Sequence, residues 1–273
     1  MILHVSAGWE ETNGAAVIGR LIAEEQRSRG EEVRFATWAS VSELRAADEV
    51  WIHCGWKPCL LWANLWAKRA VRVPEACYDP VRLGYHGWKK RLAGPVERWA
   101  LRRSAKVIAT CPAERDWIAR YEPHARVEVT DVKRFFELAA SSVAAPSARP
   151  HVLYLGRRHP LKGVGYLESA CAEVGGLELR VVSGAVGAEK ERVWEWCDVL
   201  VLPTLSDNFG LVVAEALSRG KRVVVTDGAP AWEPADGAAT DFGGRLVYVR
   251  GFRGGSAAAR IALLVSALRR LAL

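Results

Sequence analysis

Four carboxylates interrupt the largely apolar segment DNFGLVVAEALSRGKRVVVTDGAPAWE, which runs from residue 207 to residue 233. They are Asp207, Glu215, Asp227 and Glu233. Glu215 stands among valine, alanine and leucine early in an expected helix, where a buried carboxylate is costly unless hydrogen-bond donors surround it. Asp207 lies at the start of that helix and could act only as its N-cap, while Asp227 and Glu233 could be only loop caps. In the alternative interpretation, these carboxylate oxygens accept hydrogen bonds from the hydroxyls of a sugar.

A second set of candidate residues lies in the segment YLGRRHPLKG. Gly156 ends an expected strand, and Arg157 and Lys162 follow it in a loop before the next helix. Arginine can bind phosphate through two parallel hydrogen bonds, and lysine adds a point charge. This arrangement predicts a diphosphate site, whereas the plain alternative is two solvated cations on a loop.

The loop after the first expected strand, SAGWEETNGAA, contains Gly8 and Gly14. These glycines would let the backbone approach a ligand at the next helix N-terminus, although the loop could also be a simple turn. The spacing is not the G-x-G-x-x-G of dinucleotide-binding folds, which disfavours an NAD-dependent enzyme.

Strands and helices alternate along almost the whole chain, which predicts an α/β fold with parallel sheets covered on both faces. The rhythm breaks at ELAASSVAAPSARP, which is rich in alanine, serine and proline. We therefore expect a first Rossmann-like domain at residues 1–140, a linker at 138–150 and a second domain at 151–273. Ligands of such sheets collect at the carboxyl ends of the strands, so the two sheets should face a ligand cleft.

Composition limits the possible classes of protein. The chain has 273 residues, half of them hydrophobic, with a net charge of +7. The positive charge either serves solubility or indicates an anionic partner. Six cysteines without C-x-x-C spacing favour a reducing compartment, most simply the cytoplasm. The N-terminal MILHVSAG is expected to be a strand and not a signal peptide, and no apolar run is long enough to cross a bilayer.

A basic helix rich in tryptophan is expected in HGWKKRLAGPVERWALRR, with Pro95 marking a helix start. Trp88, Lys89, Lys90 and Arg91 open this segment, and cations interleaved with tryptophan suit an anionic membrane surface. The alternative is a solvated helix whose tryptophans pack inward. Nucleic acid is not expected as a partner, because the sequence contains no known nucleic-acid-binding module.

The motifs GRRHPLKG and SDNFGLVVAEALSRGKRVVVTDGAPAWE resemble those of the retaining GT-B glycosyltransferases of family 4, or group 1, particularly the bacterial enzymes that build lipopolysaccharide cores. The resemblance is strong over residues 152–234. It is looser over the first domain, where IHCGW and WKKRLAGPVERWALRRSAKVIATCPAERDWI look like their counterparts.

The resemblance implies transfer of a sugar, with retention and no required metal, from a nucleotide sugar such as a UDP-sugar to a glycan or lipid-linked acceptor. It implies that Arg157 and Lys162 hold the donor diphosphate, that Glu215 binds the ribose hydroxyls, and that Asp207 lies near the donor sugar. The further donor-binding candidates are Gly14, Gly156, Thr204, Asn208, Phe209, Gly210 and Leu211. The acceptor or membrane candidates are Trp88, Lys89, Lys90 and Arg91, which would place the protein at the cytoplasmic face of a membrane.

Two positions depart from the family pattern. Asp207 is one methylene shorter than the usual glutamate, and Glu75 and Ala76 stand where relatives commonly carry His-Gly. Glu75, His53 or His86 would have to take the place of that active-site histidine, although His53 could equally be structural. A catalytically weak homologue that only binds nucleotide sugars, and a sugar-nucleotide epimerase of the same fold, therefore remain alternatives.

Overall fold

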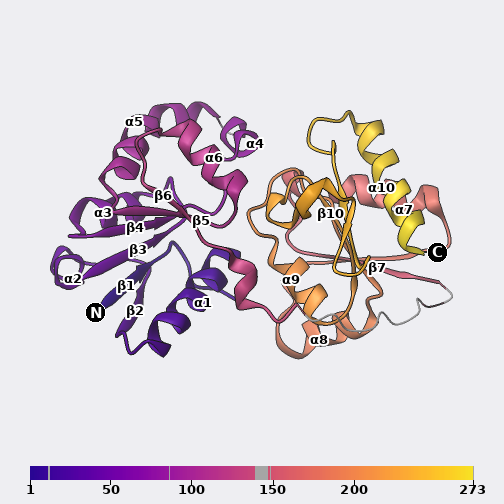
Figure 1. Ribbon diagram of the computed structural model, residues 1–273, viewed down its shortest axis with the longest axis horizontal. Helices are drawn as coiled ribbons and strands as arrows, with labels where there is room; N and C mark the ends of the chain where they lie inside the picture. Colours follow the sequence, from indigo (N-terminus) through magenta and orange to yellow (C-terminus); the bar gives the residue numbers. More distant parts are fainter. Residues whose placement is uncertain (12, 86, 139–146, 148, 273) are drawn as a thin grey trace. The chain divides into compact units, whose positions relative to one another are not determined.

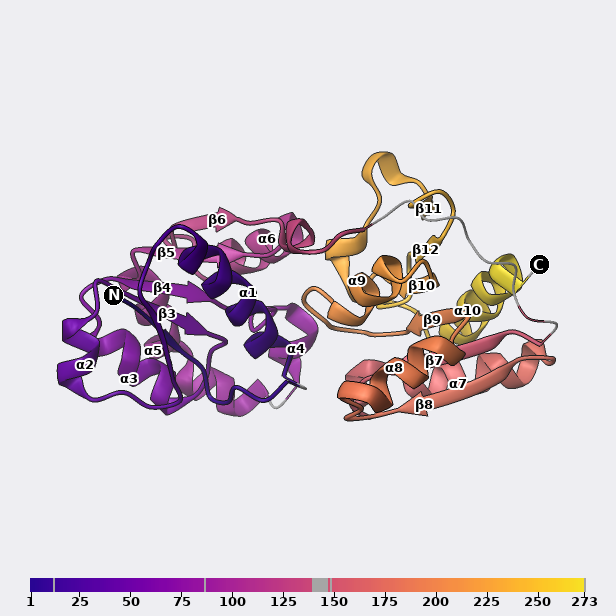
Figure 2. The ribbon, with the colours of Figure 1, turned by 90° about the horizontal axis from the view of Figure 1, so that it is seen from below.

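A computed structural model describes residues 1–11, 13–85, 87–138, 147 and 149–272. The chain forms two compact units, Met1–Val132 and Lys133–Leu273. Each unit is an α/β sandwich around one sheet (Figures 1 and 2). Most of the expected linker at 138–150 lies outside the described residues, and so does the candidate His86.

Unit 1 is built on a six-stranded sheet in the order β2-β1-β3-β4-β5-β6, and every neighbouring pair of its strands is parallel. The strands of unit 1 are β1 (Ile2–Val5), β2 (Val33–Ala36), β3 (Glu49–His53), β4 (Ala70–Val73), β5 (Lys106–Ala109) and β6 (Val127–Val129). Its helices are α1 (Gly14–Ser28), α2 (Val41–Ala46), α3 (Pro58–Trp66), α4 (Pro80–Gly84), α5 (Gly87–Arg103) and α6 (Pro112–Tyr121), and a 3-10 turn, η1 (Val132–Phe135), follows at the unit boundary.

Alternating residues of β1 bury opposite faces of this sheet. Ile2 packs with Ala23 of α1, whereas Leu3 belongs to a cluster that contains Leu44 of α2 and Leu60 of α3. Successive side chains of a strand point to opposite faces, so a strand apolar at every position must be covered twice. All four residues of β1 are buried, as this arrangement requires.

Unit 2 repeats the architecture with the strand order β11-β12-β10-β9-β7-β8. Its pairs are parallel except for the short edge strand β11, which runs antiparallel to β12. The strands of unit 2 are β7 (His151–Leu155), β8 (Glu178–Val182), β9 (Val199–Leu202), β10 (Arg222–Thr226), β11 (Thr240–Asp241) and β12 (Leu246–Val249). Its helices are α7 (Val164–Val174), α8 (Gly187–Trp196), α9 (Leu211–Ser218) and α10 (Ala257–Ala272), with 3-10 turns η2 (Pro160–Lys162), η3 (Pro230–Trp232) and η4 (Ala235–Gly237).

The predicted fold class is confirmed: both units are Rossmann-like layers of parallel strands and helices. One local expectation is wrong, because Pro95 lies inside α5 and does not begin a helix. Tertiary contacts hold the helix on both sides of the proline. The Gly94 carbonyl accepts a hydrogen bond from the Tyr121 hydroxyl at 3.4 Å, and Glu97 is buried against Arg72. Packing therefore offsets the hydrogen bond that proline cannot donate.

Candidate functional site

The central contact of the candidate site in unit 2 joins two loops that follow neighbouring strands. Lys162, in the turn after β7, forms an ion pair with Asp207, in the loop after β9. Both side chains are largely buried, at 15% and 21% exposure. Because β7 and β9 are parallel neighbours, their carboxyl ends meet at one edge of the sheet. The structure thus brings together two residues that are distant in sequence and that were both predicted to touch the donor.

Two glycines allow these loops to pack on one another. A side-chain carbon at Gly163 would lie 2.0 Å from the carbonyl oxygen of Pro203, and one at Gly228 would lie 1.9 Å from that of Thr204. Gly163 also has φ +68°, a left-handed conformation that costs little only for glycine. The K-G pair in the sequence is therefore required by close backbone approach, whichever ligand the loop binds.

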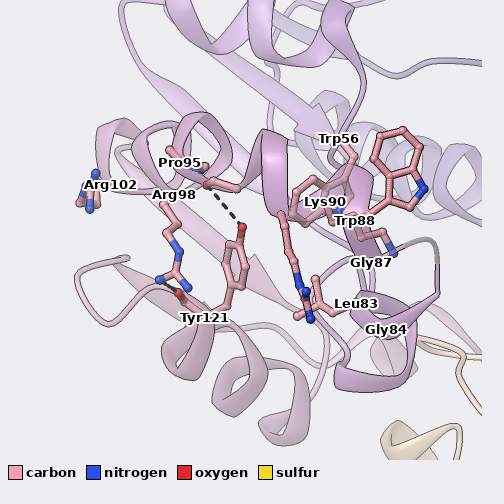
Figure 3. Close-up of a pocket in the computed structure, with 12 residues that line it drawn as sticks. Trp56, Leu83, Gly84, Gly87, Trp88, Lys90, Pro95, Arg98, Arg102 and Tyr121 are labelled. Carbon is pink, nitrogen blue, oxygen red and sulfur yellow. Dashed lines mark hydrogen bonds between the residues drawn. The ribbon is translucent and has the colours of Figure 1, made fainter.

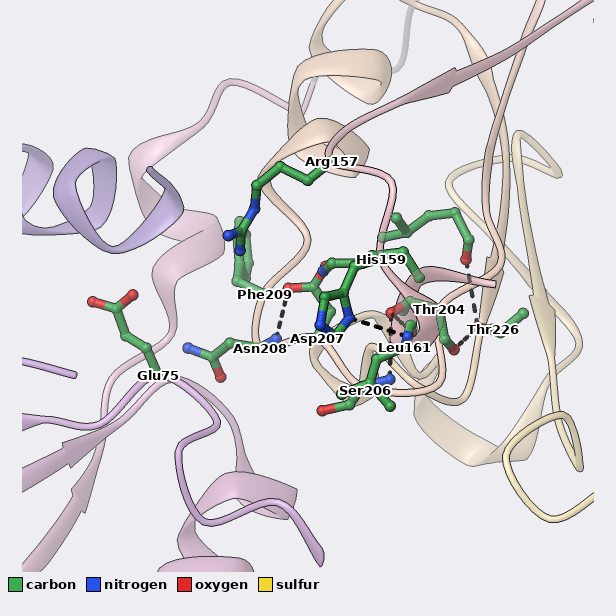
Figure 4. Close-up of polar contacts among 12 residues, drawn as sticks. Glu75, Arg157, His159, Leu161, Thr204, Ser206, Asp207, Asn208, Phe209 and Thr226 are labelled. Atoms are coloured by element: carbon green, nitrogen blue, oxygen red, sulfur yellow. Dashed lines mark hydrogen bonds and ion pairs between the residues drawn. The ribbon is translucent and has the colours of Figure 1, made fainter. Parts of the chain in front are cut away.

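Hydrogen bonds fix the loop after β9 from both sides (Figure 4). The Thr204 hydroxyl donates to the Leu161 carbonyl at 3.0 Å, and the Thr226 hydroxyl donates to the Thr204 carbonyl at 2.6 Å. The Asp207 amide donates to the Gly228 carbonyl at 2.7 Å. Thr204 therefore positions the loop through its backbone and side chain.

Asp207 is not the N-cap of α9, which corrects one of the two interpretations of this residue. Gly210 occupies the cap position with φ +65°, and α9 begins at Leu211. Asp207 instead accepts a hydrogen bond from the Asn208 amide at 2.8 Å with one oxygen and pairs with Lys162 through the other. The carboxylate consequently lies ahead of the helix, beside the lysine.

Phe209 anchors the start of α9 in the core. Its side chain is 1% exposed and packs against Phe136 and Trp232, with ring centroids 5.7 and 5.0 Å away. The Trp232 indole donates a hydrogen bond to the Phe209 carbonyl. Phe209 therefore supports the loop from behind, while Gly210 and Leu211 form the tip of the helix.

Glu215 has a protein partner on a different helix. Its Oε1 lies 2.8 Å from Nζ of Lys190 in α8, and its Oε2 is buried without a hydrogen-bond donor among the described residues. The Ser206 hydroxyl, in the loop before α9, is likewise buried and unbonded within that part of the chain. Buried polar atoms are nearly always hydrogen-bonded, so these two oxygens lack partners that a ligand or a local rearrangement would have to supply.

The other two acidic residues of this segment serve loops. Asp227 accepts hydrogen bonds from the amides of Gly251 and Arg253 at 2.9 and 3.0 Å, and Glu233 pairs with Arg250 at 3.1 Å. The alternative in which these two carboxylates are loop caps agrees with these contacts.

Arg157 is exposed and lies on the same strand-end loop as Lys162 (Figure 4). The hydroxyl of Tyr154 donates to the Arg157 carbonyl at 2.8 Å, and the Ser183 hydroxyl donates to that of Gly156 at 2.7 Å. Burial raises the pKa of Tyr154, so its hydroxyl stays protonated and donates this bond. The loop backbone is thus fixed while the guanidinium extends into solvent.

The candidate residues of unit 1 also gather at the carboxyl ends of its strands. Gly14 is exposed at the start of α1, where the Asn13 side chain caps the helix by accepting from the Ala15 amide at 3.2 Å. His53 ends β3 and Glu75 follows β4, and His53 Nδ1 lies 3.4 Å from Glu75 Oε1. The structure therefore brings together two of the three residues proposed as substitutes for the family histidine; the third, His86, lies outside the described residues.

Burial shifts the pKa values of His53 and Glu75 in opposite directions, each toward its uncharged form. Burial lowers the pKa of His53 to about 3 and raises that of Glu75 well above its usual range, an effect that Glu114 increases and Arg82 opposes. Glu75 and Ala76 have φ of +55° and +59°, a left-handed conformation that costs about 1–2 kcal/mol for residues with a side chain. Such strain is concentrated at functional sites.

A cavity of about 900 Å³ lies against α5 in unit 1 (Figure 3). Basic and aromatic side chains line it. They include Lys90, Arg91, Arg98, Trp56, Trp88 and Tyr121. Arg98 donates to the Tyr121 carbonyl and Lys90 to the Arg82 carbonyl, and desolvation lowers the pKa of Lys90. The cavity is therefore positively charged and has aromatic walls.

An apolar stripe runs along the outer face of α5. Trp88, Leu92, Val96 and Trp99 are 64%, 75%, 49% and 37% exposed, and their spacing of four, four and three residues places them on one side of a helix. The alternative in which these tryptophans pack inward is therefore wrong. Lys89 lies 5.5 Å from the ring centroid of Trp88, and cations thus flank the stripe.

Lys190 is the residue of the candidate site in unit 2 that the sequence did not reveal. It lies on α8, and its role follows only from the contact that folding makes with Glu215 on α9. All six cysteines are free, and four of them are buried. Across the described stretches, we find no helix long and apolar enough to cross a membrane.

Two families match the chain. The family described as "Glycosyl transferase 4-like domain" matches residues 10–132, and the one described as "Glycosyl transferases group 1" matches residues 170–247. The two matches fall in units 1 and 2, respectively. No curated protein matches the sequence.

Several solved structures share the fold over nearly the whole chain. Sucrose-phosphate synthase from Thermosynechococcus elongatus is 15% identical with a TM-score of 0.70, and the match covers 99% of this chain and 91% of that one. Anabaena HepE in complex with UDP-glucose is 16% identical with a TM-score of 0.67 and the same coverage. WaaG, a glycosyltransferase involved in lipopolysaccharide biosynthesis, is 12% identical with a TM-score of 0.56, covering 98% and 90%. At these identities the likeness establishes the fold.

Proposed function

Because the chain belongs to the glycosyltransferases of GT-B fold, family 4 or group 1, we propose that unit 2 binds a nucleotide-sugar donor. We propose further that the sugar of this donor is transferred to a hydroxyl acceptor with retention. The donor we propose is a UDP-sugar, since HepE, which shares the fold, is solved with UDP and with UDP-glucose. The acceptor we propose is a glycan or lipid-linked sugar of the cell envelope, as in a lipopolysaccharide core.

The observation that carries the proposal is the state of Glu215. One of its oxygens is neutralised by Lys190, and the other is buried without a donor in the described structure. A carboxylate in this state accepts hydroxyl hydrogens readily, because leaving a buried acceptor unbonded costs about 1–3 kcal/mol. Ribose hydroxyls would supply the missing hydrogen bonds.

Lys162 and Arg157 are positioned to hold the diphosphate beside the N-terminal tip of α9. Lys162 is paired with Asp207 in the structure, so the phosphate would share or replace that carboxylate as its partner. Two cations and free helix amides stabilise the charge that develops on a leaving diphosphate. The reaction we propose therefore requires no metal ion, and Asp207 would turn toward the donor sugar once Lys162 binds phosphate.

The acceptor side would be unit 1. Glu75 and His53 lie at the carboxyl ends of its strands, and Trp88, Lys89, Lys90 and Arg91 open the exposed helix α5. We propose that this helix rests on an anionic membrane at the cytoplasmic face, with the stripe in the interface and the cations among the headgroups. A lipid-linked acceptor would then be delivered at the surface on which the enzyme rests.

The test is release of UDP from UDP-glucose and other UDP-sugars, measured with and without short-chain lipid-linked saccharides. We expect acceptor-dependent release, and a loss of at least about tenfold in Lys162→Ala, which removes about 1.4 kcal/mol or more of charge stabilisation. The matched control is Arg149→Ala, which removes an exposed cation ahead of β7, at the opposite edge of the same sheet.

The other outcomes identify the alternatives. UDP binding without release from any sugar donor would indicate a catalytically inactive homologue. Release of free sugar, or interconversion of donors without an acceptor, would indicate an epimerase. The anomeric configuration of the product, determined by NMR, decides between retention and inversion.

A further inference from the structure

Four polar side chains form one hydrogen-bonded line through the interior of unit 1. Gln26 Oε1 lies 2.8 Å from His4 Nε2, His4 Nδ1 lies 3.0 Å from His53 Nε2, and His53 Nδ1 lies 3.4 Å from Glu75 Oε1. The four residues are between 0% and 6% exposed. They come from α1, β1, β3 and the turn after β4. The line therefore runs across neighbouring strands and ends at the strained turn that contains Glu75 and Ala76.

Aromatic rings enclose the two imidazoles. Trp51 stacks on His4 at 5.6 Å with an interplanar angle of 7°, and Trp9 meets His53 edge-on at 5.7 Å. Gly19 of α1 provides the necessary space, because a side-chain carbon there would lie 3.0 Å from the His53 ring and 3.0 Å from the Trp9 ring. Burial lowers the pKa of His4 to about 3, as it does for His53, so each ring carries one hydrogen at neutral pH.

The amide at one end of the line determines where those hydrogens lie. The Gln26 oxygen can only accept, so His4 donates from Nε2 and presents the lone pair of Nδ1 to His53. His53 must then donate from Nε2, which leaves the lone pair of its Nδ1 facing Glu75. A hydrogen bond at that contact requires Glu75 to be the donor, which only a protonated carboxyl can be.

We propose that Gln26 and His4 are positioning residues that set the tautomer of His53 and thereby hold Glu75 as a neutral carboxylic acid. Of the charged groups facing Glu75, Glu114 favours the protonated carboxyl and Arg82 opposes it. Glu114 of α6 accepts hydrogen bonds from the Ala76 amide and from Thr110, which oppose the burial that raises its own pKa. Arg82 of α4 donates to the Glu75 backbone carbonyl, and the Cys54 thiol is protonated, because its pKa is raised.

The four hydrogen-bonded side chains fix the protonation state of Glu75 and do not conduct protons. A proton moving inward from Glu75 would end at an amide oxygen, which is too weak a base to hold it. Glu75 therefore does not act as a general base near pH 7, and it presents a fixed, uncharged carboxyl at the edge of unit 1. This conclusion deepens the acceptor side of the proposed function, but it concerns a protonation state that is measurable without turnover.

The test uses ¹⁵N shifts of the imidazole nitrogens, recorded by long-range proton–nitrogen NMR on the full chain at pH 7. In the wild type, His4 and His53 should both carry hydrogen on Nε2 and none on Nδ1. In Glu75→Gln the pattern should persist, because an amide N–H can donate to Nδ1 as the acid does. A wild-type spectrum with hydrogen on Nδ1 of either ring would overturn the proposal.

Gln26→Glu changes one group at the far end of the line while keeping its shape. The new carboxylate favours a doubly protonated His4, which donates from both nitrogens and obliges His53 to accept at Nε2. We expect the hydrogen of His53 to move to Nδ1 and the Glu75 pKa, followed by ¹³C carboxyl titration, to fall relative to the wild type. An unchanged His53 tautomer and Glu75 titration in a folded variant would contradict the proposed control from Gln26. UDP binding to unit 2 is independent of this outcome, so the two proposals fail separately.

Discussion

At the residue scale, the four carboxylates of residues 207–233 divide into two kinds. Asp207 and Glu215 each pair with a lysine from another element, whereas Asp227 and Glu233 hold neighbouring loops. The sequence singled out all four, because acidic residues between apolar ones stand out, and their contact with a ligand stays a prediction. It could not predict the lysine partners, since Lys162 and Lys190 reach them only through tertiary packing.

The two buried histidines should make the protein sensitive to acid. Each binds a proton in the unfolded chain below about pH 6.5 but in the folded protein only near pH 3, so the free energy of unfolding falls as the pH falls through this window. At pH 5 the loss is about 2 kcal/mol for each histidine. Glu75 has the opposite sign, because its raised pKa makes the folded state bind a proton that the unfolded chain loses above about pH 4.5.

The prediction is tested by urea denaturation at pH 7 and pH 5 in the Glu75→Gln variant. This variant lacks the carboxyl whose titration changes the free energy of unfolding in the direction opposite to that of the histidines. His4→Gln should reduce the fall in unfolding free energy by about 2 kcal/mol. His124→Gln, which replaces an exposed histidine, should leave the fall unchanged. Equal falls with and without His4 would contradict the neutral, buried imidazole on which the hydrogen-bonded line depends.

At the element scale, α5 is held to its sheet by a buried ion pair. Arg72 and Glu97 are both 0% exposed, and the Tyr78 hydroxyl donates to the same Glu97 oxygen at 2.6 Å. Glu97→Gln should lower the free energy of unfolding by about 3–5 kcal/mol, because it leaves a buried guanidinium without a counter-charge. Urea titration measures the change.

A matched double variant measures whether the Arg72–Glu97 pair contributes net stability. Arg72→Met with Glu97→Leu should recover most of the loss, because Nε and Nη1 of Arg72 and Oε2 of Glu97 have no hydrogen-bond partners in the described structure. A double variant as unstable as Glu97→Gln would show that the pair contributes net stability.

The exposed face of α5 gives the second prediction at this scale. Trp88→Ser with Leu92→Ser should weaken co-sedimentation with vesicles containing phosphatidylglycerol by at least about tenfold, since two large apolar side chains no longer enter the interface. Trp38→Ser is the control, because Trp38 is 59% exposed but lies outside α5. Equal loss in the control, or equal binding to uncharged phosphatidylcholine vesicles, would contradict docking through α5.

Short elements were the part of the fold that periodicity could not predict. The six-residue helix α2 depends on its capping box, in which Ser40 and Glu43 exchange hydrogen bonds, and α4 depends on Asp79 capping a turn that begins with proline. Two turns are too few for an apolar stripe to be recognised. Long strand–helix repeats were predicted because each strand is apolar at successive positions and each long helix has one buried face.

At the scale of the whole molecule, the chain consists of two Rossmann-like units, each built on one sheet. The sequence predicted both parallel sheets, and that ligands bind at the loops after the carboxyl ends of their strands stays a prediction. It did not predict the line from Gln26 to Glu75, whose members come from four separate segments. That the two sheets face a common cleft, and that residues 138–150 act as a linker, stay predictions.

The central claim is that the edge of unit 2 around Lys162 and Glu215 binds the nucleotide diphosphate of the donor. Calorimetric titration of UDP tests it most directly. We predict one site per chain, with affinity reduced at least about tenfold in both Lys162→Ala and Glu215→Ala and unchanged in Arg149→Ala. Wild-type affinity in both site variants, or no binding of any nucleoside diphosphate to the folded protein, would contradict the account.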